Sequence, residues 1–213
     1  MSKTHSYSGG CLYTPGGRRK YLSPSERERF IEAAWSCPRP DLVTFCLVLA
    51  YSGCRLSECL ALTAQSFDCT ERFVAVQSLK KRDRQIVIRE IPLPDDVFAA
   101  IIRIHRPQDG PRSRRLWTWC RCRAWQLVKG VMNEAHIEAG IHATPKGLRH
   151  GFGIHAIRSG VPLNLVQRWL GHARMETTSI YLQAIGPEER DIAMRMWPSR
   201  TGQGPAEAAC LAG

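Results

Sequence analysis

The stretch DLVTFCLVLAYSG, at residues 41–53, restricts the possible folds more than any other part of this sequence. Apolar residues occur nearly all round the helix that it would form, and such a helix is stable only when neighbouring elements bury it. We expect Asp41 to cap the start of this helix and Gly53 to cap its end. A chain of 213 residues is long enough to surround the helix with one well-packed domain. The sequence therefore predicts a domain organised around a buried central helix.

Local signals predict further helices on both sides of this one. Ser23, Pro24 and Glu26 make the pattern of a capping box with proline at the first helical position, so a helix should run from there to about Trp35. Glycines at the ends of later apolar segments are typical of helix C-terminal caps. The other helices are expected at 55–62, 95–105, 119–140, 145–160, 162–171, 175–183 and 187–197.

A short part of the chain is typical of strands instead. Residues 66–68, 72–78 and 85–93 are rich in strand-forming residues, and the charged turn LKKRDR lies between the last two segments. Strands joined by short turns pair in an antiparallel sheet. The predicted fold class is mainly α with a small three-stranded antiparallel β-sheet.

The charge of the chain indicates the class of its partner. Thirty Lys and Arg against nineteen Asp and Glu leave a formal net charge of +11. Such an excess favours a polyanion, with nucleic acid as the first candidate and an anionic membrane surface as the second. No strongly amphipathic basic helix, no apolar run near ~20 residues and no signal peptide is visible, so we expect a cytoplasmic protein without a membrane partner.

Both ends of the chain are expected to lie outside the folded domain. Residues 1–20 are rich in Gly, Ser and Arg and end in GGRRK, which is typical of a flexible basic arm. Residues 198–213 are predicted to be a disordered tail. The folded domain is therefore expected at 21–197.

The nine cysteines do not indicate a metal site. Cys46, Cys54 and Cys59 lie in apolar helical context and are interpreted as small core residues. Cys120 and Cys122 are too close together for an ordinary zinc knuckle, and no second pair follows at a suitable spacing. We expect no metal and no other cofactor.

Four polar residues occur where a buried helix meets a loop: Arg55, Arg149, His172 and Tyr181. An arginine in apolar surroundings either faces solvent or is paired, because an unpaired buried guanidinium is very unfavourable. Two such arginines in a basic protein suggest a phosphate site, since guanidinium groups bind phosphate oxygens in pairs and stabilise the charge of a transition state. A tyrosine hydroxyl beside them is able to attack the phosphorus. The alternative interpretations are a surface arginine and a core tyrosine.

Two sequence boxes resemble those of the tyrosine recombinase (phage integrase) family. The first is SGCRLSECLAL, and the second is TPKGLRHGFGIHAIRSGVPLNLVQRWLGHARMETTSIYL. Together the boxes lie in a family-like order and spacing that covers most of residues 22–185. The resemblance implies the fold of a recombinase catalytic domain. It also implies that Arg55 and Arg149 are the catalytic arginines, that Glu58 steadies the first of them, that His172 binds the scissile phosphate, and that Tyr181 is the nucleophile.

The resemblance also implies a catalytic lysine on the hairpin between the second and third strands. Lys80 and Lys81 both qualify, and Lys80 is favoured because it follows the strand directly. The other charges of this turn are expected to contact the DNA backbone. The complete set of predicted DNA contacts is Arg18, Arg19, Lys20, Lys81, Arg82 and Arg84.

One position departs from the pattern of the family. Lys146 stands where the family usually has histidine, although some members carry lysine there. Lysine binds phosphate and donates a proton, but an unperturbed pKa of about 10 makes it a poor base at neutral pH. Neighbouring cations would lower that value. His142 and His150 lie nearby and are the alternatives for the role of that histidine, but we favour interpreting them as a loop residue and a structural hydrogen-bond partner.

The resemblance implies a catalytic-domain-only recombinase. Such an enzyme would cleave and rejoin duplex DNA at specific sites through a 3′-phosphotyrosine, for integration, excision or inversion of a mobile element. It would act as a homotetramer on DNA, with residues 187–197 passed to a neighbouring subunit. Two alternatives are a cleavage-deficient DNA-binding regulator with the same fold and a DNA relaxase similar to type IB topoisomerases.

Overall fold

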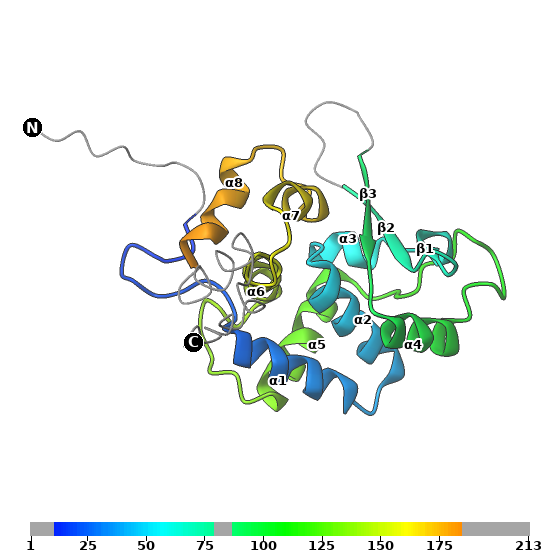
Figure 1. The fold of residues 1–213 in the computed structure, drawn as a ribbon. Helices are drawn as coiled ribbons and strands as arrows, with labels where there is room; N and C mark the ends of the chain where they lie inside the picture. Colours follow the sequence, from blue (N-terminus) through cyan, green and yellow to red (C-terminus); the bar gives the residue numbers. More distant parts are fainter. Residues whose placement is uncertain (1–10, 79–86, 185–213) are drawn as a thin grey trace, which may run out of the picture.

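In the computed structural model, which describes residues 11–78 and 87–184, the apolar helix α2 (Pro40–Ser52) lies at the centre of a mainly helical domain (Figure 1). Nearly all of its side chains are buried, as the sequence predicts. No helix in the described part of the chain is both long and apolar enough to span a membrane. The other helices are α1 (Pro24–Trp35), α3 (Leu56–Leu60), α4 (Asp95–His105), α5 (Arg121–Glu134), α6 (Pro145–Arg158), α7 (Leu163–Leu170) and α8 (Glu176–Ser179), with short 3-10 helices η1 (Ala64–Ser66) and η2 (Ile180–Ala184).

The strands form the predicted three-stranded antiparallel sheet beside this helical body (Figure 1). Strands β1 (Phe67–Asp68), β2 (Phe73–Gln77) and β3 (Ile88–Pro92) pair in sequence order. Val74 lies opposite Ile91, and both side chains are buried. The fold class predicted from the sequence is therefore confirmed.

Most helix ends lie where the local signals place them. Ser23 and Glu26 form the complete capping box of α1. Gly53 caps α2 with φ of 60°, in the left-handed region that favours glycine. The predicted N-cap of α2 is wrong, because Arg39 occupies that position. Pro40 takes the first helical position, and Asp41 lies inside the first turn.

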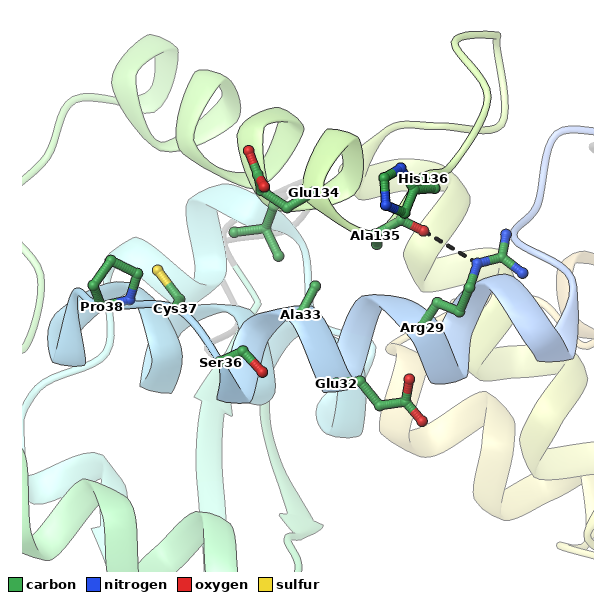
Figure 2. A pocket seen from close by; sticks show the side chains of 10 residues that line it. Arg29, Glu32, Ala33, Ser36, Cys37, Pro38, Glu134, Ala135 and His136 are labelled. Carbon is green, nitrogen blue, oxygen red and sulfur yellow. Dashed lines mark hydrogen bonds between the residues drawn. The ribbon is translucent and has the colours of Figure 1, made fainter.

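Helix α5 ends at Glu134 and does not continue to residue 140 as the sequence predicts. His136 has φ of 51°, a conformation that no helix continues through. A tertiary contact fixes this end, since Nε of Arg29 on α1 donates a hydrogen bond of 3.1 Å to the carbonyl of Ala135. Figure 2 shows this bond at the edge of a hollow of about 630 Å³ between α1 and α5, which contains none of the predicted site residues.

Residues 11–20 do not form the free arm that the sequence predicts. Leu12 is completely buried in an apolar cluster, and Tyr13 forms a β-bridge with Arg19. Arg19 is also ion-paired with Glu26 of the α1 capping box. Burial of Leu12 and this ion pair together hold the segment against the domain. Residues 1–10, the helix predicted at 187–197 and the tail predicted at 198–213 lie outside the described residues.

Two apolar clusters meet along α6. The larger cluster surrounds α2 and includes Leu148 of α6, whereas the smaller one contains Leu12, Phe152 and Tyr181. Arg149 lies between Leu148 and Phe152 in sequence and is itself buried. The fold thus places a buried cation at the junction of its two cores.

Candidate active site

The predicted catalytic side chains of the described residues meet at one cavity. Its volume is about 950 Å³, and it is lined by α3, α5, α6 and the segment from α8 to η2. These elements are far apart in the sequence, so the cavity exists only in the folded domain. Five predicted catalytic residues line it, namely Arg55, Lys146, Arg149, His172 and Tyr181, together with the supporting residue Glu58.

Glu58 holds Arg55 at the mouth of this cavity. Arg55 is the N-cap of α3, and its Nη1 donates a hydrogen bond of 2.7 Å to Oε1 of Glu58. Burial by itself would raise the pKa of Glu58, but the hydrogen bonds and charges of Arg89 and Arg55 outweigh burial and lower the pKa. The carboxylate is therefore ionised, and the Arg55 side chain remains 37% exposed toward the cavity.

Arg89 is a buried partner of this pair that the sequence analysis missed. Its Nη2 lies 2.8 Å from Oε2 of Glu58, and its Nε donates to the carbonyl of Trp169. The signal available in the sequence is the period of two in strand β3, where Ile91 faces the core and places Arg89 on the same face. Arg89 thus fixes the carboxylate that orients Arg55.

Arg149 joins the two glycine-capped helix ends of the site. Its Nη1 donates to the carbonyl of Gly53 at 2.7 Å, and its Nη2 donates to the carbonyl of Leu170 at 2.5 Å. Burial, with a smaller contribution from Arg55, lowers its pKa to about 10, so the group stays charged at neutral pH. A guanidinium has five N–H donors, and these two bonds leave donors free for a ligand in the cavity.

His172 is oriented by the short helix that follows it. Its Nδ1 lies 2.9 Å from the hydroxyl oxygen of Thr178, whose side chain is completely buried. Burial, followed by the charges of Arg149 and Arg55, lowers the pKa of His172 to about 3. The ring is therefore neutral at pH 7. In the tautomer whose Nδ1 accepts from Thr178, Nε2–H is the donor that remains for a ligand.

Tyr181 is completely buried at the inner wall of the cavity. Its ring lies nearly parallel to the ring of His172, with centroids 6.2 Å apart. Its hydroxyl lies 3.1 Å from Nδ1 of His150. Burial raises the pKa of Tyr181 to about 12, although Arg149 and Arg55 act in the opposite direction. The hydroxyl is therefore protonated at neutral pH.

The remaining predicted site residues differ in exposure and in their distance from the cavity. Lys146 is exposed in the first turn of α6, at the rim of the cavity. His142 lies near the capping box, with its Nε2 3.6 Å from Oε1 of Glu26. Of the predicted DNA contacts, Arg18 is exposed and Lys20 is half-buried, whereas Arg19 is engaged by Glu26 and is not free for DNA. Lys80, Lys81, Arg82 and Arg84 lie outside the described residues.

The described end of the hairpin lies close to the same site. A second hollow of about 540 Å³ is lined by Ser78 and Val87, and it shares Arg55 and His172 with the main cavity. Ser78 also accepts a hydrogen bond from Nη1 of Arg89. The strand that precedes Lys80 in the sequence therefore ends beside Arg55.

None of the cysteines within the described residues lines the main cavity. Cys46, Cys54 and Cys59 are buried and free, as predicted, whereas Cys120 and Cys122 are exposed. Among residues 11–78 and 87–184, no group of three His, Cys, Asp or Glu side chains is placed to hold a metal ion.

Substitution of Gly171 by alanine should disturb the site through Arg89. Gly171 has φ of 63°, and an added Cβ would lie 2.5 Å from Nη1 of Arg89. We expect Gly171→Ala to lower the free energy of unfolding by about 3 kcal/mol, about 1 from the strained backbone and about 2 from overpacking. Gly17→Ala is the matched control, because its φ is 73° and its Cβ would meet nothing within 4 Å. Urea unfolding should separate the two variants, and equal losses would contradict the role assigned to Arg89.

Comparisons with known proteins show which proteins this chain is similar to. The sequence model of the phage integrase family matches residues 20–185. A tyrosine recombinase of Thermosipho africanus is 32% identical over 157 residues, which cover 70% of this chain and 52% of that protein. The crystal structure of XerA recombinase aligns with a TM-score of 0.67 and 26% identity, over 84% of this chain and 65% of that chain. XerH recombinase bound to its difH substrate aligns with a TM-score of 0.64 and 18% identity, over 87% and 60% of the two chains. The chain spans about half the length of the curated relatives it matches.

Proposed function

The chain belongs to the phage integrase family, and we propose that it is a site-specific DNA recombinase that cleaves and rejoins duplex DNA through a covalent 3′-phosphotyrosine intermediate. The observation that carries this proposal is the cavity that Arg55, Arg149, His172 and Tyr181 line together. These four groups supply positive charge, a neutral donor and a nucleophilic hydroxyl around a space large enough for a phosphodiester.

The two arginines and His172 would bind the non-bridging oxygens of the scissile phosphate. Negative charge grows on these oxygens as the phosphorus becomes pentacoordinate, so donors fixed in advance stabilise the transition state more than the bound substrate. The arginine charges are already held in place by Glu58 and by backbone carbonyls, so little reorganisation is required. This division of work needs no metal and no other cofactor.

Tyr181 would attack the phosphorus while the 5′ oxygen leaves with a proton from the hairpin lysine. Lys80 is the proposed donor, with Lys81 as its alternative. The position of Ser78 beside Arg55 and His172 in the second hollow supports a donor on this hairpin. Energy of the broken bond is retained in the phosphotyrosine, so a 5′ hydroxyl rejoins the strand without a high-energy cofactor.

Duplex DNA with specific recombination sites is the proposed partner. A net charge of +11 supports a polyanionic ligand, and the XerH neighbour is bound to its DNA substrate. Exchange of strands between two sites needs two cleaved duplexes, so we propose a homotetramer assembled on DNA through residues 187–197. Movement of a mobile element in the cytoplasm is the proposed context.

Capture of covalent adducts from a mixed DNA pool tests this proposal. Nicked duplexes with a randomised core would release a short strand on cleavage and so trap the phosphotyrosine. Adducts would be isolated under denaturing conditions in EDTA and their DNA sequenced. We expect a defined set of sequences attached through their 3′ phosphates. A DNA-binding regulator would retain DNA only under native conditions, and the absence of any adduct would refute the proposal.

A two-site assay then separates recombination from relaxation. The duplex selected above would be placed twice in one plasmid. A recombinase inverts or excises the intervening segment, whereas a relaxase changes only the supercoiling. The family match favours the first outcome.

The Lys146 variants test whether this lysine contributes to cleavage. Lys146 is exposed at the cavity rim, where its charge would reach the phosphate. Lys146→Ala should reduce the cleavage rate about 100-fold, a typical contribution of one proton-transfer or charge-stabilising group, and Lys146→Arg should reduce it less. Lys146→His should retain activity with a lower pH optimum, because an imidazole keeps its positive charge only at lower pH than an amine does. Wild-type rates in Lys146→Ala across the pH range would make the lysine a bystander.

A further inference from the structure

We propose that His150 is a catalytic residue that accepts the hydrogen bond of the Tyr181 hydroxyl and takes up its proton as the bond to phosphorus forms. This inference rests on the recombinase function proposed above and gives a chemical role to a residue for which the sequence favours a structural one. Three features of the site support this inference: the contact between His150 and Tyr181, the packing that holds the tyrosine ring, and the protonation states of the two side chains.

The contact joins the reacting atom directly to an acceptor. Nδ1 of His150 lies 3.1 Å from the Tyr181 hydroxyl, and the two ring centroids are 5.9 Å apart. A buried hydroxyl requires a partner, and within the described residues the hydroxyl has this hydrogen bond alone. When Nδ1 of His150 carries no proton, this bond points the proton of Tyr181 at His150.

Packing of the Tyr181 ring against helix α6 keeps the hydroxyl at this distance from His150. Gly153 lies one turn after His150, so both residues share a face of the helix. A Cβ on Gly153 would lie 2.6 Å from Cζ of Tyr181, so the ring occupies the space that a side chain would fill. On the other side the ring is stacked with His172. The hydroxyl is thus placed by contacts on the ring as well as by its hydrogen bond.

The protonation of both groups suits this transfer. Burial, followed by the charges of Lys146, Arg149 and Lys20, lowers the pKa of His150 to about 4. The imidazole is therefore neutral at pH 7 and free to accept. Tyr181, by contrast, enters the reaction with its proton in place. The proton should move only while the bond to phosphorus forms, because that bond makes the phenol oxygen far more acidic.

Other candidates for this role are less well placed. Lys146 is exposed, and within the described part of the chain it makes no hydrogen bond to Tyr181. An ammonium group also has three donors and no acceptor. Nδ1 of His172 is engaged by Thr178, and the His172 ring meets the face of the tyrosine instead of its hydroxyl. His150 is the group that geometry selects.

The step balances without any further reactant. The Tyr181 oxygen forms a bond to phosphorus, the bond from phosphorus to the 5′ oxygen breaks, and the tyrosine proton passes to Nδ1 of His150. The departing 5′ oxygen receives its proton from Lys80, as proposed above. In the rejoining step the 5′ hydroxyl gives its proton back to Lys80 and attacks the phosphorus, the bond from phosphorus to Tyr181 breaks, and His150 returns the proton to the Tyr181 oxygen.

The first test compares three variants on the nicked duplex selected with the wild-type protein. His150→Asn keeps an acceptor oxygen near the position of Nδ1 but does not take up a proton. His150→Ala removes both functions, and His155→Asn is the control on the exposed side of the same helix. We expect His150→Asn to cleave at least about 100-fold more slowly than wild type, and His155→Asn to cleave at the wild-type rate.

A sulfur substrate separates the two ends of the reaction. In a 5′-bridging phosphorothiolate the leaving group is a thiolate, which departs without a proton. This substrate should restore cleavage by Lys80→Ala but not by His150→Asn. If the sulfur substrate restores cleavage by His150→Asn, the histidine acts on the leaving group and the proposal is overturned. Cleavage by His150→Asn at the wild-type rate on both substrates would also overturn it. The absence of adducts with the wild-type protein would refute the recombinase function itself.

The pH profile gives a readout that a structural role would not change. The charged and titratable groups that face His150 are Lys20, Lys146, Arg149, His172 and Tyr181. Because the cations among them keep His150 neutral, the wild-type rate at limiting DNA should hold as the pH falls through 6.5 and decline only at lower pH. In His150→Asn this decline of the cleavage rate at low pH, the acid limb of the profile, should disappear. An unchanged limb would contradict the proposal.

Nitrogen NMR of the DNA-free protein tests the hydrogen bond without any cleavage. If Tyr181 donates to Nδ1, the His150 ring carries its proton on Nε2, and Tyr181→Phe should shift the Nδ1 resonance. A ring protonated on Nδ1 would reverse the bond and overturn the proposal. This measurement and the thermal unfolding of each variant also show whether the variant is folded.

Discussion

Tyr181→Phe is expected to abolish covalent protein–DNA adducts while leaving DNA affinity near that of the wild type. The substitution removes the oxygen that is proposed to attack the phosphorus and nothing else. The phenyl ring keeps its place against Gly153 and His172, and both arginines keep their charges. The free energy of unfolding should fall by about 1 kcal/mol, the contribution of the lost hydrogen bond to His150. Denaturing gels after incubation with the selected nicked duplex measure the adduct, and native gels measure affinity.

Tyr51→Phe is the matched control for this experiment. Tyr51 is half-buried on α2, packs under the guanidinium of Arg27 and does not line the cavity. It should form adducts at the wild-type rate. An adduct in Tyr181→Phe would mean that another residue is the nucleophile, and a large loss of DNA affinity would mean that the hydroxyl serves binding more than chemistry.

Much of this fold follows from local signals in the sequence. The capping box at Ser23 and the glycine caps at Gly53 and Gly171 locate helix ends because each depends on the conformation of a few neighbouring residues. Arg55 lies two residues after Gly53, and His172 directly follows Gly171, so the two glycine caps place these side chains at the cavity. Residues positioned by a local cap are therefore the part of a site that sequence analysis recovers best.

Features fixed by distant contacts were not predictable in this way. Helix α5 stops early because Arg29, about a hundred residues before it, binds the carbonyl of Ala135. Residues 11–20 are basic and glycine-rich, yet burial of the single Leu12 side chain helps to hold them against the domain. Composition describes the average of a segment, whereas one apolar contact is enough to decide its position.

The pairing of Arg89 with Glu58 and the contact of His150 with Tyr181 were not predictable for a related physical reason. Arg89 lies in a strand whose apolar residues Ile88 and Ile91 occupy opposite faces, so alternation alone gives two possible inward faces. His150 lies beside Arg149, and the helix period places it on the face of Gly153 without showing what packs there. Only the fold brings Tyr181 to that face. A single sequence does not show which distant elements pack against each other, and these two contacts depend on that packing.

Loss of the Arg149 side chain should also have a large effect, both on the cleavage rate and on stability. Loss of the Arg55 side chain should lower mainly the cleavage rate. Both variants, Arg55→Ala and Arg149→Ala, should slow cleavage by about 100- to 1000-fold, the typical cost of losing one donor to a developing oxyanion. Both should weaken DNA binding far less, because their charge acts mainly on the transition state. Single-turnover cleavage and native-gel affinities measure the two quantities separately.

The two variants should separate in stability. Arg55 is 37% exposed, and Glu58 keeps Arg89 as a partner when Arg55 is removed, so Arg55→Ala should change the free energy of unfolding by less than about 1 kcal/mol. Arg149 is buried and bonds the carbonyls of Gly53 and Leu170. Its loss leaves two buried acceptors unpaired, so Arg149→Ala should cost about 3 kcal/mol.

Arg149→Lys tests whether the two carbonyl bonds matter beyond charge. A lysine keeps the positive charge but has one small ammonium group, which does not span both carbonyls as the planar guanidinium does. We therefore expect Arg149→Lys to recover little stability, about 1 kcal/mol at most, and little cleavage activity. Urea unfolding of the three variants decides the point. If Arg149→Ala unfolds like Arg55→Ala, the bonds to Gly53 and Leu170 contribute nothing. In that case Arg149 serves the phosphate alone, and the two glycine-capped helix ends hold their places at the cavity without it.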